Sequence, residues 1–162
     1  MSDEVEIGRG KRGRRAYTLD DIALVPSRRT RDPEDVNVGW QIDAYHVDIP
    51  LMAAPMDSVM SPETAIAFGR LGGIGVLDLD GLWTRYEDPT PILDHIAHLG
   101  EEESIATLQR VYSEPIKPSL ITARLKQLRE AGVVVAGKLS PQRVQKYWRA
   151  VVDAGVDLFI IR

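Results

Sequence analysis

The chain contains no cysteine among its 162 residues. It therefore carries no disulfide, no thiolate zinc site and no cysteine nucleophile of its own. Long apolar runs are absent as well, since no stretch approaches the roughly 18 apolar residues that a spanning helix needs. The first fifteen residues are polar and lack the apolar core of a signal sequence. These absences predict a cytoplasmic protein with no membrane partner.

The sequence also has few aromatic residues, at 6%, and little excess of charge, with 20 cations against 24 anions and a net charge of −4. Such a balance offers no global field that would attract nucleic acid or an anionic membrane. A composition that is 44% hydrophobic and 27% charged is typical of one ordinary globular domain. Thirteen glycines and ten prolines indicate short elements joined by turns.

The first sixteen residues form a basic segment in which two glycines interrupt four cations: Lys11, Arg12, Arg14 and Arg15, with Gly10 and Gly13. We predict a flexible basic arm over residues 1–16. The interpretation we favour is a solvated tail, because short charge runs are usually just that. The alternative is contact with nucleic acid or phosphate.

Residues 17–50 are predicted to be extended, turn-rich chain with one hairpin. From residue 51 onward the sequence repeats one pattern: a short apolar run, a helix with a capped start and a glycine stop. The expected strands are residues 51–56, 74–79, 133–136 and 156–161. Ser61-Pro62 and Ser140-Pro141 are typical helix starts, and Gly72, Gly132 and Gly155 are placed to end helices. Alternation of this kind implies parallel strands with helical crossovers and hence an α/β domain.

Between the second and third expected strands lies a long stretch with two more helical patterns, at residues 90–99 and 101–112. His95 and His98 are expected on a solvated helix face, because a zinc site needs three or four protein ligands. The last expected strand reaches Arg162 with no covering helix, which would leave an exposed edge. We therefore expect the sequence to be the front part of a longer α/β protein.

Two strings of the sequence, Tyr17–Pro26 and Pro50–Val59, are followed by the glycine-rich Gly72–Gly75. Together they closely resemble the inosine-monophosphate dehydrogenase and guanosine-monophosphate reductase family. The resemblance implies an α/β fold of the (β/α)8 TIM-barrel type, typically a homotetramer, of which residues 17–162 are the truncated first half. The nucleotide would bind at the carboxyl ends of the strands. The stretch after the second strand is too short for the two regulatory domains that the dehydrogenases commonly insert there.

The resemblance also implies a function, which is NAD-dependent oxidation of inosine monophosphate to xanthosine monophosphate in guanine nucleotide metabolism. In the family a cysteine attacks the purine and forms a thioimidate, and this cysteine would lie beyond the present chain, which cannot turn over by itself. Two alternatives stay open: an NADPH-dependent guanosine monophosphate reductase, and a non-catalytic nucleotide-binding paralogue. The implied cofactor is NAD or NADP, with potassium as a candidate cation in the missing part.

The resemblance assigns substrate binding to the turn Ala54, Pro55, Met56, Asp57 and Ser58. Met56 aligns with the residue that packs against the purine, a role that suits a polarizable thioether; the alternative is barrel core. Asp78, Lys138 and Arg162 are the expected cofactor-binding residues. Asp78 follows a strand where the family carries histidines, and Arg162 stands where it carries an aspartate. An arginine there reverses the local electrostatics, which suits the extra phosphate of NADP or abolishes ordinary cofactor binding. No catalytic or metal-binding residue is expected within this chain.

Overall fold

The structure is a computed structural model that describes residues 4–23, 25 and 32–162. The chain divides into two compact units, residues 1–37 and 38–162. The first unit contains a two-stranded antiparallel hairpin, β1 (Glu4–Glu6) and β2 (Arg12–Arg14), followed by the short 3-10 helices η1 (Leu19–Asp21) and η2 (Pro33–Asp35). The mobility and the solvation that we expect of residues 1–16 stay predictions. In the string Tyr17–Pro26, Leu24 and Pro26 lie outside the described residues.

The second unit opens with another antiparallel hairpin, β3 (Trp40–Ile42) and β4 (Tyr45–Val47). Asp43 turns the chain between the two strands with a φ of 48°, a left-handed conformation that aspartate tolerates better than most residues.

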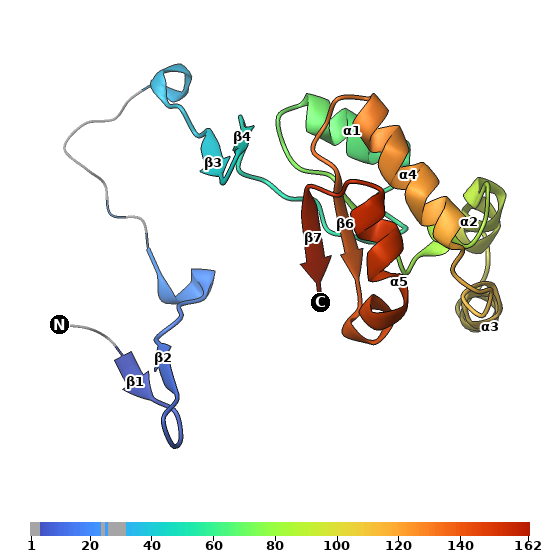
Figure 1. The fold of residues 1–162 in the computed structure, drawn as a ribbon, viewed down its shortest axis with the longest axis horizontal. Coiled ribbons are helices and arrows are strands. Elements are labelled where there is room, and N and C mark those ends of the chain that lie inside the picture. The colour runs from blue at the N-terminus through green and yellow to red at the C-terminus, as the bar shows by residue number, and fades with distance from the viewer. Residues whose placement is uncertain (1–3, 24, 26–31) are drawn as a thin grey trace. The chain divides into compact units, whose positions relative to one another are not determined.

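A three-stranded parallel sheet forms the centre of this unit, in the order β5 (Val76–Asp78), β6 (Ala136–Leu139) and β7 (Leu158–Ile161) (Figure 1). An extended segment continues the sheet beyond β5 through a parallel bridge between Met52 and Ile74. The prediction of an α/β fold with parallel strands is therefore confirmed.

Three helices pack on one side of this sheet: α1 (Pro62–Arg70), α4 (Pro118–Glu130) and α5 (Pro141–Asp153). The Ser61 hydroxyl accepts the Thr64 N–H at 3.0 Å and caps α1, as the sequence predicts. Gly72, Gly132 and Gly155 follow the three helices with φ of 94°, 72° and 76°. Glycine suits these positions because a Cβ is strained at positive φ.

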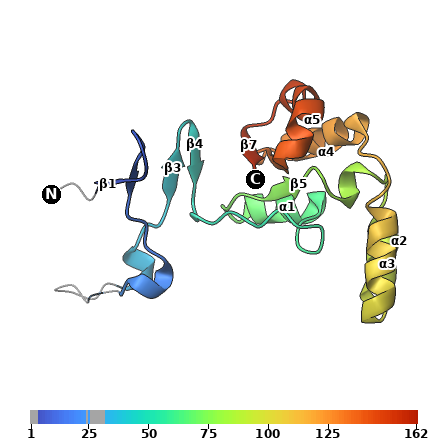
Figure 2. The ribbon, with the colours of Figure 1, turned by 90° about the horizontal axis from the view of Figure 1, so that it is seen from below.

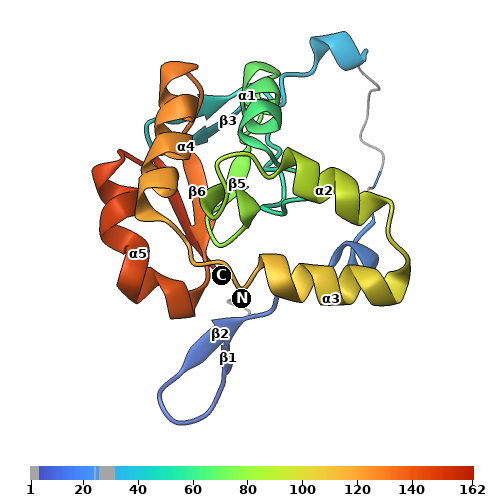
Figure 3. The same ribbon diagram turned by 90° about the vertical axis from the view of Figure 1, so that its right-hand side faces the viewer.

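The other two helices, α2 (Thr90–Ala97) and α3 (Glu101–Val111), confirm the helical patterns expected between the second and third strands. They lie side by side as an antiparallel pair that projects away from the sheet (Figures 2 and 3). His95 and His98 are exposed on α2, as expected. The 3-10 helix η3 (Leu82–Thr84) connects β5 to this pair.

The strands alternate between two apolar faces. Leu77 and Leu139 pack with helix residues such as Leu125 in the main core. Val76 and Ala136 belong to a second cluster, which includes Val47 of β4 on the opposite face. Because successive strand residues point to opposite sides, Asp78 and Lys138 belong to the same face as Val76 and Ala136.

Two strand predictions need correction. The sequence predicts a strand over residues 51–56, but within this segment only Met52 makes a ladder bridge, and Leu51 is 58% exposed. The reason is that this segment is the edge of the sheet and pairs on one side only. The third strand was expected at residues 133–136 but runs from Ala136 to Leu139. Parallel pairing with β5 and β7 determines this register, and it overrides the β-propensity of the preceding valines.

Candidate functional site

A cleft of about 450 Å³ opens beside the carboxyl end of β5. Side chains from the turn after the first extended segment, from β5, from η3, from the α2–α3 pair and from the residue after α3 line it: Met56, Asp57, Ser58, Asp78, Leu82, Leu93, Ile96, Leu108 and Tyr112. The carboxyl ends of parallel strands are where α/β proteins usually bind their ligands. This cleft is therefore the candidate binding site.

We call residues Ala54–Ser58 the substrate turn, after the role that the sequence resemblance implies for them. Its backbone is held by a hydrogen bond from the Met56 N–H to the Ala54 carbonyl at 3.0 Å, and the Met60 N–H bonds to the Met56 carbonyl at 2.8 Å. Met56 is 49% exposed and lines the cleft with Asp57 and Ser58, whereas Ala54 and Pro55 lie outside its lining. Met56 is thus available to a ligand and is not closed into the core.

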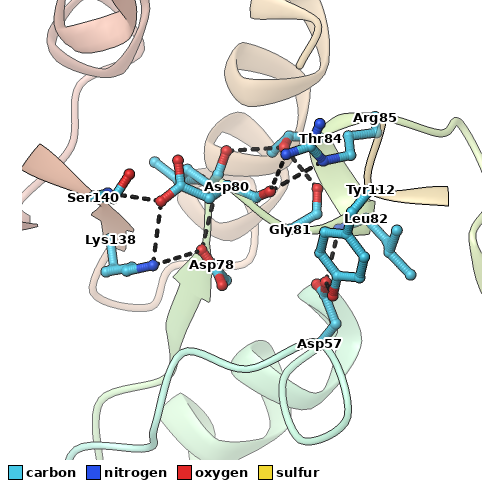
Figure 4. A network of polar contacts seen from close by, with 11 residues as sticks. Asp57, Asp78, Asp80, Gly81, Leu82, Thr84, Arg85, Tyr112, Lys138 and Ser140 are labelled. Atoms are coloured by element: carbon cyan, nitrogen blue, oxygen red, sulfur yellow. Dashed lines mark hydrogen bonds and ion pairs between the residues drawn. The ribbon is translucent and has the colours of Figure 1, made fainter. Parts of the chain in front are cut away.

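Asp57 is the most constrained residue of the turn. Its Oδ2 accepts the Leu82 N–H at 2.8 Å and the Tyr112 hydroxyl at 2.5 Å (Figure 4). Its Oδ1 is buried without a hydrogen-bond partner among the described residues. A Cβ on Gly81 would overlap the same carboxylate, so only glycine fits there. Burial raises the pKa of the Asp57 carboxyl, while the hydrogen bonds from Tyr112 and Leu82 act in the opposite direction.

A second polar group joins the ends of β5 and β6. The Lys138 ammonium lies 3.3 Å from Asp78 Oδ1 and 3.2 Å from Asp80 Oδ2 (Figure 4). Asp80 Oδ2 also accepts the Ser140 N–H at 2.7 Å. Burial raises the pKa of the Asp78 carboxyl, although the Asp80 N–H and the nearby ammonium oppose the increase. Burial also disfavours the charge on Lys138, but attraction to Asp78 and hydrogen bonding to Asp80 outweigh it and raise the lysine pKa.

The loop after β5 is anchored from within. Arg85 is only 5% exposed and donates to the carbonyls of Asp80, at 2.9 and 3.1 Å, and of Glu114. The Thr84 hydroxyl hydrogen-bonds to the Leu79 and Gly81 carbonyls at 2.9 and 3.0 Å. These bonds fix the backbone that presents Asp80, Gly81 and Leu82 to the site.

Among the expected cofactor residues, the structure joins Asp78 and Lys138 in an ion pair and places Arg162 directly after β7, the strand next to that of Lys138. Asp78 lines the cleft, and the Lys138 ammonium forms ion pairs with the carboxylates of Asp78 and Asp80. Arg162 is exposed, and its N–H donates to the Leu139 carbonyl at 3.2 Å. Within the described ranges, no cluster of three or more metal-ligating side chains occurs.

Sequence reasoning missed Tyr112, Arg85 and the site role of Asp80. Tyr112 follows a helix far along the chain, and only tertiary packing brings it to Asp57. Sequence reasoning selects Asp78 and not Asp80, although the spacing of two residues between them could have indicated a shared cation. No pattern in the sequence around Arg85 distinguishes a buried arginine from a solvated one.

Parallel strands with helical crossovers and a partly polar cleft at their carboxyl ends define a protein of the α/β class with a candidate ligand site. No helix of the described part of the chain combines the length and the hydropathy needed to cross a bilayer. Comparison with known proteins then identifies the family. The family model of the IMP dehydrogenase / GMP reductase domain matches residues 16–162, so the chain belongs to that family.

Individual relatives agree with this assignment. An uncharacterized oxidoreductase of Mycolicibacterium smegmatis is 43% identical over 163 residues, which cover 98% of this chain and 44% of the relative. An inosine-5'-monophosphate dehydrogenase of Methanocaldococcus jannaschii is 42% identical over 64 residues, or 40% of this chain and 13% of that enzyme. The chain spans less than half the length of the curated relatives it matches.

A solved structure shows the same fold. The crystal structure of an IMP dehydrogenase/GMP reductase-like protein from Corynebacterium glutamicum superposes with a TM-score of 0.82 at 41% identity. The match covers 99% of this chain and 44% of that chain. The parallel sheet and its helices are therefore shared with this relative.

Proposed function

We propose that the chain forms the amino-terminal half of a (β/α)8 barrel whose remainder completes the nucleotide site. The support is geometric. Helices α1, α4 and α5 cover one face of the parallel sheet, as crossovers in a barrel do. The other face carries Ile74, Val76 and Ala136, which suits the layered apolar interior of a barrel.

The proposed activity is the NAD-dependent oxidation of inosine monophosphate to xanthosine monophosphate. A cysteine of the remainder would add to purine C2, hydride would leave C2 for the nicotinamide, and water would then hydrolyse the thioimidate and release the thiol. A thiolate suits this step because it is both a nucleophile and a leaving group. The observation that carries the proposal is the substrate turn, with Met56 half-exposed on a cleft at the carboxyl end of a parallel sheet.

The present chain would bind and orient the nucleotide. Met56 would pack its thioether against the flat purine base, with Asp57 and Ser58 beside it in the same cleft wall. Ala54 and Pro55 would shape the backbone of the turn. These assignments make the turn a binding element and leave the bond-making groups to the remainder.

Asp78 suits the binding of a dinucleotide, whereas the net charge around Lys138 opposes it. Asp78 lines the cleft and can accept a hydrogen bond from a ribose hydroxyl. Lys138 is neutralised by two carboxylates, so the group as a whole carries negative charge and repels phosphate. When bound, NAD would supply a hydride acceptor, with Asp78 as its candidate contact on this chain.

Arg162 favours a second candidate function, an NADPH-dependent guanosine monophosphate reductase. Its cation is exposed, and alternation along β7 places it on the same sheet face as Ile160, which pairs with Lys138. A guanidinium there suits the extra phosphate of NADP.

A non-catalytic nucleotide-binding paralogue would lack the cysteine. A homotetrameric assembly, a potassium ion in the remainder and a cytoplasmic location complete the proposal.

The test uses the full-length protein. Titration calorimetry should detect binding of inosine monophosphate or guanosine monophosphate. Absorbance at the nicotinamide band should then show either NADH formed with inosine monophosphate or NADPH consumed with guanosine monophosphate. NADH formation supports the dehydrogenase and NADPH consumption supports the reductase. Binding without turnover supports the paralogue, and absence of nucleotide binding refutes all three.

Met56→Ala tests the turn itself. We expect about tenfold weaker nucleotide binding, because the lost thioether contacts are worth roughly 1–2 kcal/mol. Met52→Ala is the matched control, since Met52 is also 49% exposed but lies outside the cleft lining. Equal affinities of the two variants would refute the assignment of Met56.

A further inference from the structure

The α2–α3 pair lines the cleft and also connects to the substrate turn. Leu93, Ile96 and Leu108 supply the apolar part of the lining, while Tyr112, directly after α3, reaches across to Asp57 with its hydroxyl 2.5 Å from Oδ2 (Figure 4). A phenol that donates to a carboxylate forms a charge-assisted hydrogen bond, which is stronger than a neutral one. This bond ties the helical pair to the substrate turn.

Asp57 is placed to transmit that constraint to the ligand. It lies between Met56 and Ser58, and all three line the cleft. Leu82 N–H holds the same carboxylate oxygen from a second side, and Gly81 packs against the carboxylate from a third. These contacts restrain the Asp57 side chain, and through it the turn to which Met56 and Ser58 belong.

Tyr112 is itself held in place. The guanidinium of Arg85 lies 5.6 Å from the centroid of its ring, and Arg85 is buried and bonded to the carbonyls of Asp80 and Glu114. The ring of Tyr112 is thus held by a buried cation that is itself fixed. The Tyr86 hydroxyl, by contrast, donates to the backbone carbonyl of Val111 at 3.1 Å and not to Asp57.

We propose that Tyr112 is a positioning residue that acts through Asp57 to set the geometry of the substrate turn for the nucleotide. This inference rests on the proposed nucleotide binding and assigns a specific role to the helical pair. Tyr112 does not act as an acid or base in this proposal, since burial and the adjacent carboxylate raise its pKa well above the ordinary value.

The charges around Asp57 supply a distinctive readout. The ionisable groups that face it are Tyr112 from α3, Arg85 after η3, Asp78 from β5 and Lys138 from β6. Burial raises the pKa of the Asp57 carboxyl, and the Tyr112 hydroxyl is the first of the groups that hold this increase back. Without that hydroxyl, Asp57 takes up its proton at a higher pH.

The experiment compares Tyr112→Phe with Tyr86→Phe in the full-length protein. Each variant deletes one phenol oxygen near the end of α3, but only Tyr112 bonds to Asp57. We expect Tyr112→Phe to weaken binding of inosine or guanosine monophosphate about tenfold, as loss of one hydrogen bond to a charged group implies. Tyr86→Phe should bind within twofold of the wild type, and thermal melting checks that both variants fold.

A pH profile and a double-mutant cycle separate positioning from general support. The fall in nucleotide affinity toward low pH should begin at a higher pH in Tyr112→Phe than in the wild type and in Tyr86→Phe. In an Asp57→Asn background, Tyr112→Phe should change affinity no more than about twofold, because the charge-assisted bond is already gone. This background also tests the inference if Tyr112→Phe alone melts early.

The outcomes distinguish the two proposals. Wild-type affinity and an unshifted pH profile in Tyr112→Phe would overturn the positioning role and leave nucleotide binding intact. Equal weakening by both phenylalanine variants, or full additivity with Asp57→Asn, would also overturn it. Failure of the wild-type protein to bind either nucleotide overturns the proposed function, and this inference with it.

Discussion

Asp78 and Lys138 face each other across two adjacent parallel strands, with the ammonium nitrogen 3.3 Å from Asp78 Oδ1. Lys138 makes a second ion pair with Asp80 at 3.2 Å. The three side chains are 16–19% exposed, so water screens them only in part. One cation thus pairs with two carboxylates, which leaves a net negative charge at the edge of the candidate cleft.

Replacement of this cation should be costly. Lys138→Met keeps much of the side-chain volume but leaves two partly buried carboxylates unpaired, and we expect a loss of about 2–4 kcal/mol at pH 7.5. The pKa of Asp78 should rise further, so the loss should shrink as the pH falls and the carboxyl takes up a proton. Thermal melting of the full-length protein at pH 5 and 7.5 measures both effects.

Lys126→Met is the control for this prediction. Lys126 pairs with Glu130 at 3.6 Å on the surface of α4, where both side chains are largely exposed, and such pairs contribute little. Equal melting temperatures for the two variants at pH 7.5 would show that the Lys138 group is as well solvated as the surface pair.

Gly81→Ala tests the close approach of the loop to Asp57. The backbone of Gly81, with φ −81° and ψ −170°, is open to alanine, so the expected cost comes from overlap of the new Cβ with the carboxylate. We expect a loss of about 1–3 kcal/mol, as for other overpacked positions. Urea unfolding of the full-length protein measures it.

Gly100→Ala is the control for Gly81→Ala. Gly100 also precedes a helix, with φ −68° and ψ 164°, but a Cβ there meets nothing within 4 Å. The intrinsic cost of alanine at a helix start is common to both variants. A difference smaller than about 0.5 kcal/mol between them would argue against the overlap, since distant surface changes alone produce that much.

Asp157 makes the stability of the fold depend on pH. Its carboxylate accepts the Val135 N–H at 2.9 Å and both Arg129 and the Tyr45 hydroxyl at 2.8 Å. Burial opposes the charge, but these hydrogen bonds outweigh it and lower the pKa of the Asp157 carboxyl. A carboxyl with a lowered pKa in the folded state stabilises the protein above its unfolded pKa and loses that contribution as the pH falls through the folded value.

We therefore expect Asp157→Asn to lose about 1–2 kcal/mol at neutral pH, where the wild-type carboxylate is fully ionised. The difference from the wild type should shrink as the pH falls below about 4. Asp153→Asn, at an exposed position on α5, serves as the control. A difference between wild type and Asp157→Asn that stays constant from pH 7 to pH 3 would contradict the prediction.

Local patterns predicted most of the helices well. Ser61-Pro62 and Ser140-Pro141 precede α1 and α5, and Gly132 follows α4, because caps and left-handed stops act through neighbouring backbone groups. The register of β6 was not predicted, since Ala136–Leu139 has low β-propensity and is a strand only because β5 and β7 pair with it.

By itself the sequence determined the order of most strands and helices and the family, because these depend on short-range patterns. Only the tertiary structure decided that Lys138 pairs with both Asp78 and Asp80, and that Tyr112 bonds to Asp57 across 55 residues of chain. The physical reason is that charge pairing and burial depend on which strands and helices become neighbours, and no local pattern encodes that neighbourhood.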